Sequence, residues 1–433
     1  MTWDAHANKL TNISADQWRH GLGEPLMSDI DRDRCPDAQA LMEHAASRTG
    51  LDDFGDPARN LGLGMLTRSI TEESWAGMTP RSRVLAIDYL SHLLENRLRM
   101  AADRKAHPQI ASEAITRPLI VVGPPRSGST LLHNLLSLDP DSMAPEHWLC
   151  SEPSPPPALG KPSPARLESA NRQMTTLFGL IPDIFVTHPY MIEEGAGSLA
   201  ECGSDIMSLV FTSQQLWCFW GGETYRRFLL DADHTAALSF HREFLQAAQW
   251  RIPGKHWALK GSDHMLWLRE LARLYPDATL VWTHRDLAQQ LGSLASVQSI
   301  LRGLHGRPVT PEARRSQGRK AIDLQHAAIE KAMRSRDAIG EERFVDVSYH
   351  DLLADPVASV RRIYEKSGRA VSQEHEQRIR RWLADHHQTK HGVHRHSPEE
   401  FGMDGEEINT RFAAYRDRFG FGFGVRPELM SGQ

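Results

Sequence analysis

A glycine-bounded loop between an apolar run and an amphipathic segment is the part of the sequence best suited to chemistry. The run Leu119–Val122 is β-branched and uncharged, which predicts a strand buried on both faces. The loop 123–128 follows, and Ser129 and Thr130 begin a stretch with leucines at helical spacing. Backbone N–H groups and the helix dipole at such a junction bind anions. The segment therefore predicts a site for an anionic group such as phosphate.

The loop departs at one position from the phosphate loop of nucleotide triphosphatases. The spacing Gly123-x-x-x-x-Gly128-x-Thr130 fits that loop, but Ser129 stands where a lysine would reach the β- and γ-phosphates. Arg126 lies inside the loop. The missing lysine argues against ATP–magnesium chemistry, whereas the added guanidinium suits a terminal phosphate of another donor. The strand before the loop and the helix after it disfavour a purely structural turn.

A second motif places an arginine at a strand end and a serine eight residues later. It reads Val281-Trp-Thr-His-Arg285-Asp-Leu-Ala-Gln-Gln-Leu-Gly-Ser293. A strand-end arginine offers a bidentate fork, and a hydroxyl from the following helix completes an anion site. Taken alone, Arg285 next to Asp286 is equally compatible with a structural ion pair.

Strands and helices alternate in the part of the chain that carries both motifs. Apolar runs predict further strands at His256–Lys260, 278–285 and 343–349, each followed by a helical pattern. Four such strands predict an α/β fold, an open parallel sheet of P-loop-like type with helices on both faces. Ligands of these sheets bind at the carboxyl ends of the strands, so Lys260 and Tyr349 are expected on the same rim as the loop.

Helical patterns occupy the rest of the chain. Residues 36–104 carry apolar residues at helical spacing, with Thr71 as the expected N-cap of a short helix to Met78, and residues before about 30 are expected to be mobile. Residues 1–115 are therefore predicted to be a helical extension that packs on the core, or alternatively a cap that gates the substrate. Residues 116–425 are predicted to form the α/β domain, with a helical insertion at about 150–255.

Composition limits the class of protein. The formal net charge of the 433 residues is −5 at pH 7, so no basic field attracts nucleic acid. The four cysteines lack metal-ligand spacing, which predicts free thiols in a reducing compartment. No signal-peptide pattern and no run of about 18 apolar residues is present, so we expect a cytoplasmic protein without a membrane span.

The two motifs together resemble those of the sulfotransferase family, and in particular its bacterial branch related to the tyrosylprotein sulfotransferases. The loop variant is Pro-x-Arg126-Ser-Gly-Ser-Thr130. The resemblance covers most of the chain, with supporting matches at 50–56, 153–164, 258–262, 349–352 and 391–402. The resemblance implies 3′-phosphoadenylyl sulfate (PAPS) as sulfuryl donor and no metal requirement.

The resemblance also implies roles for individual residues. Those implied to hold the donor's 5′-phosphosulfate are Arg126, Ser127, Gly128, Ser129 and Thr130. Arg285 and Ser293 would hold the 3′-phosphate. Lys260 matches the lysine that contacts the transferring sulfonate, with an ordinary strand-end lysine as the alternative. Tyr349 would lie near the adenine or a phosphate, and a core tyrosine is the alternative.

The acceptor needs a general base, for which Glu146 is the first candidate. It lies 20 residues beyond Arg126, close to the spacing of the base in the tyrosylprotein branch. Many bacterial relatives carry a Trp-Glu pair here, whereas this chain has Trp148-Leu149. The alternative bases are His188, Glu193, Glu194 and His264.

The sequence thus predicts a sulfotransferase that moves a sulfuryl group from PAPS to a hydroxyl, or an amine, of a small-molecule acceptor. Transfer is expected to be in line, independent of metal and assisted by a carboxylate base. The aromatic residues at 211–220, predicted to be mainly core, favour an apolar or aromatic alcohol as acceptor. The alternatives are an ATP-dependent small-molecule kinase and a non-catalytic nucleotide-binding protein. No pattern indicates an oligomeric state.

Overall fold

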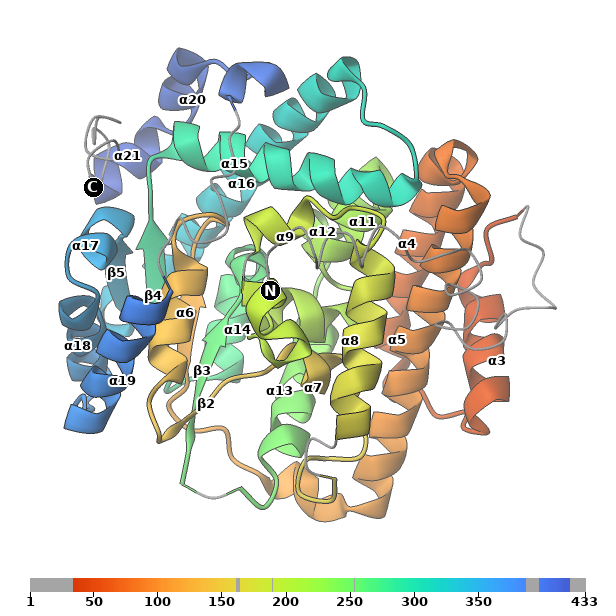
Figure 1. Cartoon of the computed structure of the whole chain (residues 1–433), viewed down its shortest axis with the longest axis horizontal. Coiled ribbons are helices and arrows are strands. Elements are labelled where there is room, and N and C mark those ends of the chain that lie inside the picture. Colours follow the sequence, from red (N-terminus) through yellow and green to blue (C-terminus); the bar gives the residue numbers. More distant parts are fainter. Residues whose placement is uncertain (1–33, 161–163, 189, 253, 387–396, 421–433) are drawn as a thin grey trace. The chain divides into compact units, whose positions relative to one another are not determined.

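The computed structural model describes residues 34–160, 164–188, 190–252, 254–386 and 397–420. The expected mobile start of the chain and positions 391–396 of the supporting matches lie outside these residues. The chain divides into two compact units (Figure 1). We call them the helical unit (the described parts of Met1–Ala114, Pro145–Pro253 and Ile300–Val309) and the sheet unit (the described parts of Ile115–Ala144, Gly254–Ser299 and Thr310–Gln433). The predicted boundaries near residues 115, 150 and 255 stay a prediction.

The helical unit is built on the long helix α5, Pro80–Ala106, which begins where the sequence places an N-cap. Thr79 Oγ1 accepts a hydrogen bond from Ser82 N at 3.3 Å, and Pro80 fills the first helical position. The remaining α-helices of this unit are α3 (Ala38–Thr49), α4 (Leu61–Ser69), α7 (His147–Ser151), α8 (Pro164–Phe178), α9 (Ile184–Thr187), α10 (Tyr190–Glu193), α11 (Gln214–Phe219), α12 (Glu223–Asp231) and α13 (Thr235–Gln249).

One prediction of helix in this unit was wrong, and another holds only in part. No helix begins at Thr71, because α4 runs directly into a π turn at Ile70–Ser74, and the Thr71 hydroxyl donates to Thr67 O at 2.8 Å. The stretch 198–220, whose apolar and aromatic residues also predict a helix, is helical only in part: a π turn spans Cys202–Ile206 and α11 begins at Gln214, with Phe211 at a φ of 55° between them. Its large side chains are buried, so this stretch is core, as expected.

The sheet unit contains five parallel strands in the order β2-β3-β1-β4-β5. They are β1 (Leu119–Val122), β2 (Ser142–Met143), β3 (His256–Lys260), β4 (Thr279–His284) and β5 (Phe344–Ser348). The helices are α6 (Ser129–Ser137), α14 (Leu268–Leu274), α15 (Leu287–Arg302), α16 (Pro311–Ile339), α17 (Tyr349–Ala354), α18 (Pro356–Lys366), α19 (Gln373–Asp385), α20 (Gly405–Arg411) and α21 (Ala413–Phe419). Sequence analysis missed β2, because two residues carry no alternation.

Helices cover both faces of the sheet, which confirms the predicted α/β fold (Figure 1). Leu119 and Val121 of β1 pack with leucines of α6 and with apolar residues of α18 and α19. On the other face Trp282 of β4 contacts Phe419 of α21, with ring centroids 5.3 Å apart, and Arg336 of α16 lies over the same indole. Burial of every β1 side chain agrees with a strand covered on both sides.

All four cysteines are buried and free, as the sequence predicts, and the reducing compartment stays a prediction. Over the described residues, no helix is both long and apolar enough to cross a membrane.

Candidate active site

The loop after β1 lies very close to the carboxyl ends of β4 and β5. Gly123 and Gly128 have φ values of 131° and 89°, a region that side chains disfavour. A Cβ atom at Gly123 would lie 2.7 Å from Thr283 O, and one at Gly128 would lie 2.6 Å from Tyr349 Cδ2. Both glycines are therefore required by backbone conformation and by close approach to β4 and the residue after β5.

Arg126 adopts a left-handed backbone within this loop, with a φ of 68°. This conformation costs a non-glycine residue about 1 kcal/mol. It directs the Arg126 carbonyl to Arg285, whose Nη1 donates to it at 3.1 Å, while Arg126 Nε donates to Ser293 Oγ at 3.1 Å. Arg126 thus links both residues of the second motif to the loop.

The Ser127 side chain supports the loop. Its hydroxyl is fully buried and lies 2.6 Å from both Pro124 O and Thr283 Oγ1. Only its backbone N–H remains to face an anion. Sequence reasoning missed Thr283, because a threonine inside a predicted strand carries no signal of a contact with a loop 156 residues away.

A buried lysine reaches the start of α6 from the neighbouring strand. Strand β3 pairs with β1, with Lys260 opposite Val121. Lys260 is 3% exposed, and its Nζ donates to Thr130 Oγ1 at 2.8 Å. Ser129, the residue before Thr130, begins α6, where backbone N–H groups face outward along the helix axis. A cation thus stands beside the helix N-terminus although Ser129 replaces the lysine of the nucleotide triphosphatases.

Arg285 is held by neutral groups. Besides the Arg126 carbonyl, its guanidinium lies over the Tyr349 ring, with Cζ 4.4 Å from the centroid. Among the described residues no carboxylate pairs with Arg285, and its buried Nε has no hydrogen-bond partner. Asp286 instead accepts from Gln289 N at 2.9 Å and caps the next helix. The interpretation of Arg285 as half of a structural ion pair is therefore not supported.

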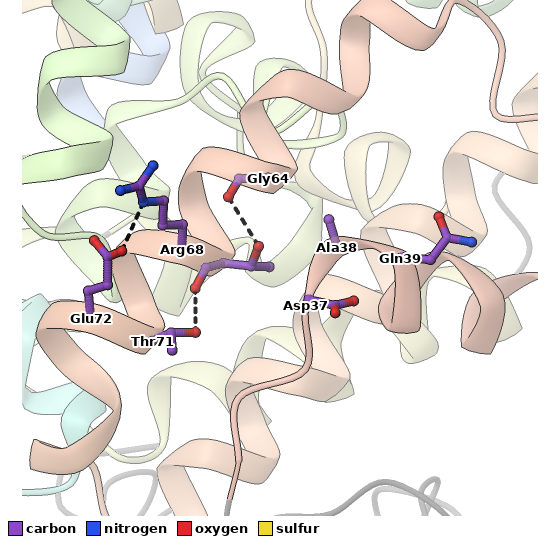
Figure 2. A pocket seen from close by; sticks show the side chains of 8 residues that line it. Asp37, Ala38, Gln39, Gly64, Arg68, Thr71 and Glu72 are labelled. Carbon is purple, nitrogen blue, oxygen red and sulfur yellow. Dashed lines mark hydrogen bonds and ion pairs between the residues drawn. The ribbon is translucent and has the colours of Figure 1, made fainter.

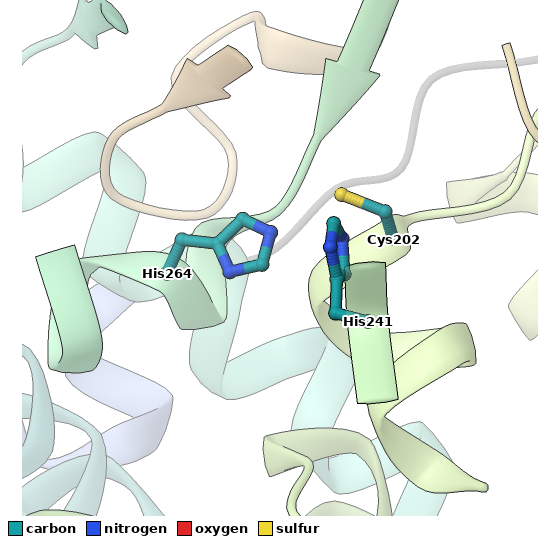
Figure 3. Close-up of side chains that lie close together, drawn as sticks. All are labelled: Cys202, His241 and His264. Carbon is teal, nitrogen blue, oxygen red and sulfur yellow. The ribbon is translucent and has the colours of Figure 1, made fainter. Parts of the chain in front are cut away.

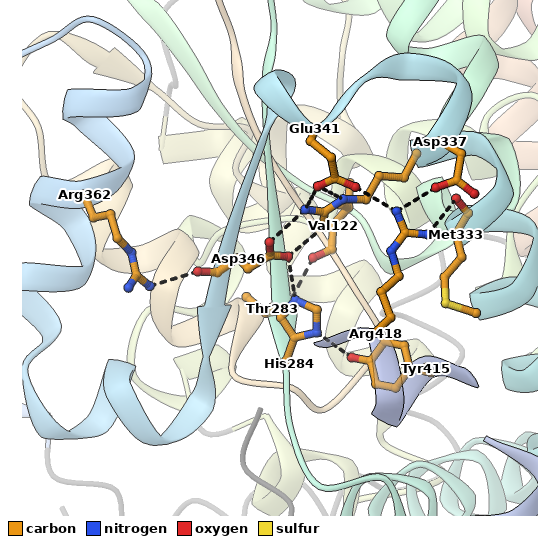
Figure 4. A network of polar contacts seen from close by, with 11 residues as sticks. Val122, Thr283, His284, Met333, Asp337, Glu341, Asp346, Arg362, Tyr415 and Arg418 are labelled. Carbon is orange, nitrogen blue, oxygen red and sulfur yellow. Dashed lines mark hydrogen bonds and ion pairs between the residues drawn. The ribbon is translucent and has the colours of Figure 1, made fainter. Parts of the chain in front are cut away.

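Next to Arg285 lies a saturated polar network (Figure 4). Arg336 donates to both carboxylate oxygens of Asp346, at 2.7 and 2.8 Å, and its guanidinium also pairs with Glu341. His284 contacts Asp346 at 2.8 Å through Nε2 and Tyr415 Oη at 2.6 Å through Nδ1. Burial opposes ionisation, but Arg336 and His284 hold the pKa of Asp346 well below its usual range. Sequence reasoning missed this network.

Glu146, in the helical unit, stands at the N-cap position of α7. Its backbone forms a bridge with Leu199. Trp148 Nε1 donates to the carboxylate, so the indole contacts Glu146 here although no Trp-Glu pair exists in the sequence. Burial raises the pKa of Glu146, and the indole N–H partly opposes that rise.

The alternative bases differ in their exposure. Glu193 and Glu194 are exposed, and His188 is half-buried with Nδ1 2.8 Å from Thr187 Oγ1. His264, in the sheet unit, is fully buried. Figure 3 labels His264, and also Cys202 and His241 of the helical unit; each of the three is fully buried. That the reaction needs no metal stays a prediction.

The helical unit also has a shallow pocket of about 380 Å³ between the start of α3 and α4 (Figure 2). Arg68 and Glu72, which line it, form an ion pair at 2.9 Å. Thr67 and Thr71 are hydrogen bonded within their own helix. Its polar groups are thus paired, and none is a predicted site residue.

A sequence model of the sulfotransferase family matches residues 118–373, more than half of the chain. The chain belongs to the sulfotransferase family. The match begins at β1 and includes both motifs. Curated relatives in Mycobacterium bovis and Mycobacterium tuberculosis, each named omega-hydroxy-beta-dihydromenaquinone-9 sulfotransferase Stf3, are 23% identical to this sulfotransferase over 318 residues, 70% of its chain and 75% of theirs.

Two solved sulfotransferase structures are similar over most of the chain. STF9 from Mycobacterium avium superposes with a TM-score of 0.77 at 28% identity, covering 92% of this sulfotransferase and 100% of STF9. STF1 from M. tuberculosis H37Rv has a TM-score of 0.71 at 28% identity, covering 88% of this chain and 100% of STF1. Family and relatives together make this protein an enzyme of the sulfotransferase class.

Proposed function

We propose that this sulfotransferase transfers a sulfuryl group from PAPS to a hydroxyl of a small apolar acceptor. The observation that carries the choice of donor is Arg285, a guanidinium with a buried, unpartnered Nε and no carboxylate among the described residues. Such a group suits a phosphate. PAPS has a 3′-phosphate, which ATP lacks, and the absence of a lysine at Ser129 further disfavours ATP.

Bound PAPS supplies a sulfuryl group activated by its bond to the 5′-phosphate. The N–H groups of the loop and of Ser129 and Thr130 donate to anionic oxygens at the start of α6. Lys260, beside Thr130 Oγ1, neutralises charge on the sulfonate and on the leaving oxygen. Arg126 holds the 5′-phosphate, and Arg285 with Ser293 holds the 3′-phosphate.

Glu146 acts as the base in this proposal. It takes the proton from the acceptor hydroxyl as the oxygen forms a bond to sulfur and the bond from sulfur to the donor's phosphate oxygen breaks. The products are the sulfate ester and 3′-phosphoadenosine 5′-phosphate, and Glu146 returns its proton to solvent. Its raised pKa supports this role, because a base works best with a pKa near the working pH. Glu146 is half-buried, whereas the alternative base His264 is fully buried.

The proposed acceptor class rests on two observations. The curated relatives are named for an omega-hydroxylated menaquinone, a hydroxyl on an apolar molecule. The helical unit contains a cluster of aromatic rings in which Phe219 lies 6.0 Å from Tyr89, 6.3 Å from Phe178 and 5.4 Å from Trp220. Phe219 and Trp220 are core, but Tyr89 and Phe178 are half-buried, and their partly exposed rings support an apolar alcohol over a sugar or an acidic peptide. Free, buried thiols support the proposal of a cytoplasmic location.

Binding and transfer assays test the donor and the acceptor separately. Calorimetry should show binding of 3′-phosphoadenosine 5′-phosphate without magnesium and no comparable binding of ATP–magnesium. Labelled PAPS, offered with lipid, phenolic, sugar and peptide acceptors, should label the apolar alcohols. Preference for ATP–magnesium would favour the kinase. Donor binding without transfer to any acceptor class would favour the non-catalytic alternative.

Glu146→Gln tests the base. We expect turnover to fall by about 10²–10⁴-fold, because the amide cannot accept the proton. Affinity for 3′-phosphoadenosine 5′-phosphate should remain that of the wild type. Glu193→Gln and Glu194→Gln, which change exposed carboxylates, should keep wild-type rates. Wild-type turnover in Glu146→Gln would assign the base elsewhere.

A further inference from the structure

The segment that carries Glu146 is anchored at both ends within the helical unit. At the start of α7, His147 N donates to Ser198 O at 3.0 Å, and just before it Ala200 N donates to Pro145 O at 2.9 Å. At the end of α7, Asn96 Nδ2 donates to Ser151 O at 2.8 Å. The backbone around Glu146 is thus fixed, and the direction of its carboxylate depends on side-chain contacts.

The carboxylate is not used as a helix cap. An acidic residue at an N-cap position ordinarily accepts from a backbone N–H of the first helical turn. Glu146 makes no such bond, and among the described residues only Trp148 Nε1 hydrogen bonds to its carboxylate, at Oε2. Oε1 is therefore left to accept a proton.

Trp148 is itself held firmly. Its side chain is 6% exposed, and the Arg166 guanidinium lies over the ring with Cζ 5.0 Å from the centroid. Arg166 is fixed by donating to the carbonyls of Gly160, at 2.7 Å, and of Glu152. Arg166 therefore holds Trp148, and Trp148 in turn holds one oxygen of the Glu146 carboxylate, Oε2.

We propose that Trp148, backed by Arg166, is a positioning residue that orients Glu146 for proton transfer. This inference rests on the proposed role of Glu146 as the base. An indole N–H only donates, so it cannot compete for the proton. It is also neutral, so it fixes the carboxylate without the strong drop in basicity that a lysine or arginine donor would cause. These two properties suit a group that must orient a base and leave it basic.

Other titratable groups lie on the neighbouring segments but do not bond to Glu146. They are His92 on α5, His147 and Cys150 on α7, Glu152 after α7, Arg166 on α8 and Asp205 near His147. His147 Nδ1 is 3.8 Å from Asp205, and Glu152 accepts from Ser169 and Gln173. The pKa of Glu146 is set by burial, which raises it, and by Trp148, which lowers it.

Trp148→Phe removes the N–H and keeps an aromatic ring. The indole stabilises the charged carboxylate, so its loss raises the pKa of Glu146, and the acidic limb of kcat/KM should move up by about one pH unit. A ¹³C-glutamate NMR titration, assigned with Glu146→Gln, should show the same upward shift without turnover. Binding of 3′-phosphoadenosine 5′-phosphate should not change. Trp75→Phe, in another arginine–tryptophan stack with Arg83 at 5.0 Å, is the matched control and should keep the wild-type profile.

Arg166→Lys is the second variant, for use if Trp148→Phe does not fold. A lysine cannot reach the carbonyls of both Gly160 and Glu152 or stack on the indole as a planar group. The acidic limb of kcat/KM should therefore move in the same direction as in Trp148→Phe, by a smaller amount. A wild-type pH profile and a wild-type carboxyl titration in these variants would overturn the inference while leaving Glu146 as base. Full turnover in Glu146→Gln would instead overturn the proposed base itself.

Discussion

Two arginines of the sheet unit have opposite surroundings. Arg336 on α16 donates to Asp346 and pairs with Glu341, two carboxylates labelled in Figure 4. The Arg336 side chain is 4% exposed. Arg285, at the end of β4, contacts the Arg126 carbonyl and the Tyr349 ring and pairs with no carboxylate in the described part of the chain. The charge of Arg336 is satisfied by the protein, whereas that of Arg285 is not.

The difference between the two arginines predicts that Arg336 contributes to stability and Arg285 to ligand binding. A buried cation that already has its carboxylates offers nothing to a ligand, but breaking the pair leaves a buried charge. A cation held only by a carbonyl and an aromatic face keeps its charge for an incoming anion. We therefore expect substitutions in the network to change unfolding, and substitutions at Arg285 to change affinity for the donor.

Arg336→Met should produce the largest effect. Methionine preserves much of the volume but leaves Asp346 without its bidentate partner, and loss of one member of a buried pair costs about 3 kcal/mol or more. Urea unfolding should show this decrease in the free energy of unfolding. The folded fraction should bind 3′-phosphoadenosine 5′-phosphate with wild-type affinity.

Arg334→Met provides the control on the same helix. Arg334 is largely exposed, and its partner Glu330 is 3.6 Å away, so the loss should stay below about 1 kcal/mol. Equal stability of the two variants would show that the network contributes no more than a surface pair does.

Arg285→Ala should weaken binding of 3′-phosphoadenosine 5′-phosphate by about 100-fold or more, because a charge-assisted contact to a phosphate is lost. Its free energy of unfolding should change little, since no carboxylate among the described residues loses a partner. The affinity of Arg285→Lys should lie between those of the wild type and Arg285→Ala, because lysine keeps the charge without the planar fork. Calorimetry measures each affinity; an unchanged affinity in Arg285→Ala would contradict the proposed 3′-phosphate site.

The binding residues could be predicted from the sequence, whereas the polar network around Arg336 could not. Arg126, Lys260, Arg285 and Tyr349 are predictable because parallel strands end on one edge of a sheet, so residues at strand ends gather there. The structure confirms the strands at Leu119–Val122 and His256–Lys260 and the helix Pro311–Ile339. Leu119–Val122 is uniformly apolar, His256–Lys260 has three apolar residues before its terminal lysine, and the helix has a clear Thr-Pro start.

The network and the supports of the loop are not predictable in the same way. Asp346 is one polar residue inside a strand, and Tyr415 belongs to a separate helix, so their contacts with His284 depend on tertiary packing. Thr283 bonds to Ser127 for the same reason. Trp148 marked a departure from the family pattern, but only the structure places its N–H on Glu146.

A smaller effect of pH should distinguish the network from the binding site. His284 is 1% exposed, and burial lowers its pKa although Asp346 opposes that change. Because a carboxylate only accepts, the neutral ring donates from Nε2 to Asp346 and accepts at Nδ1 from Tyr415. The unfolded chain takes up the proton near the ordinary pKa of about 6.5, so this residue makes the fold less stable as pH falls through that value.

His284→Asn removes this titration and keeps a polar side chain. The difference in unfolding free energy between the wild type and His284→Asn should shrink from pH 8 to pH 5, by at most about 1.4 kcal/mol per pH unit. Urea unfolding of both proteins at several pH values measures this difference. The contributions of the other histidines are the same in both proteins and cancel in it. A difference that grows as pH falls would mean that attraction by Asp346 exceeds the effect of burial. The network would then hold a charged histidine next to Arg285, and the contrast between the two arginines would no longer separate stability from binding.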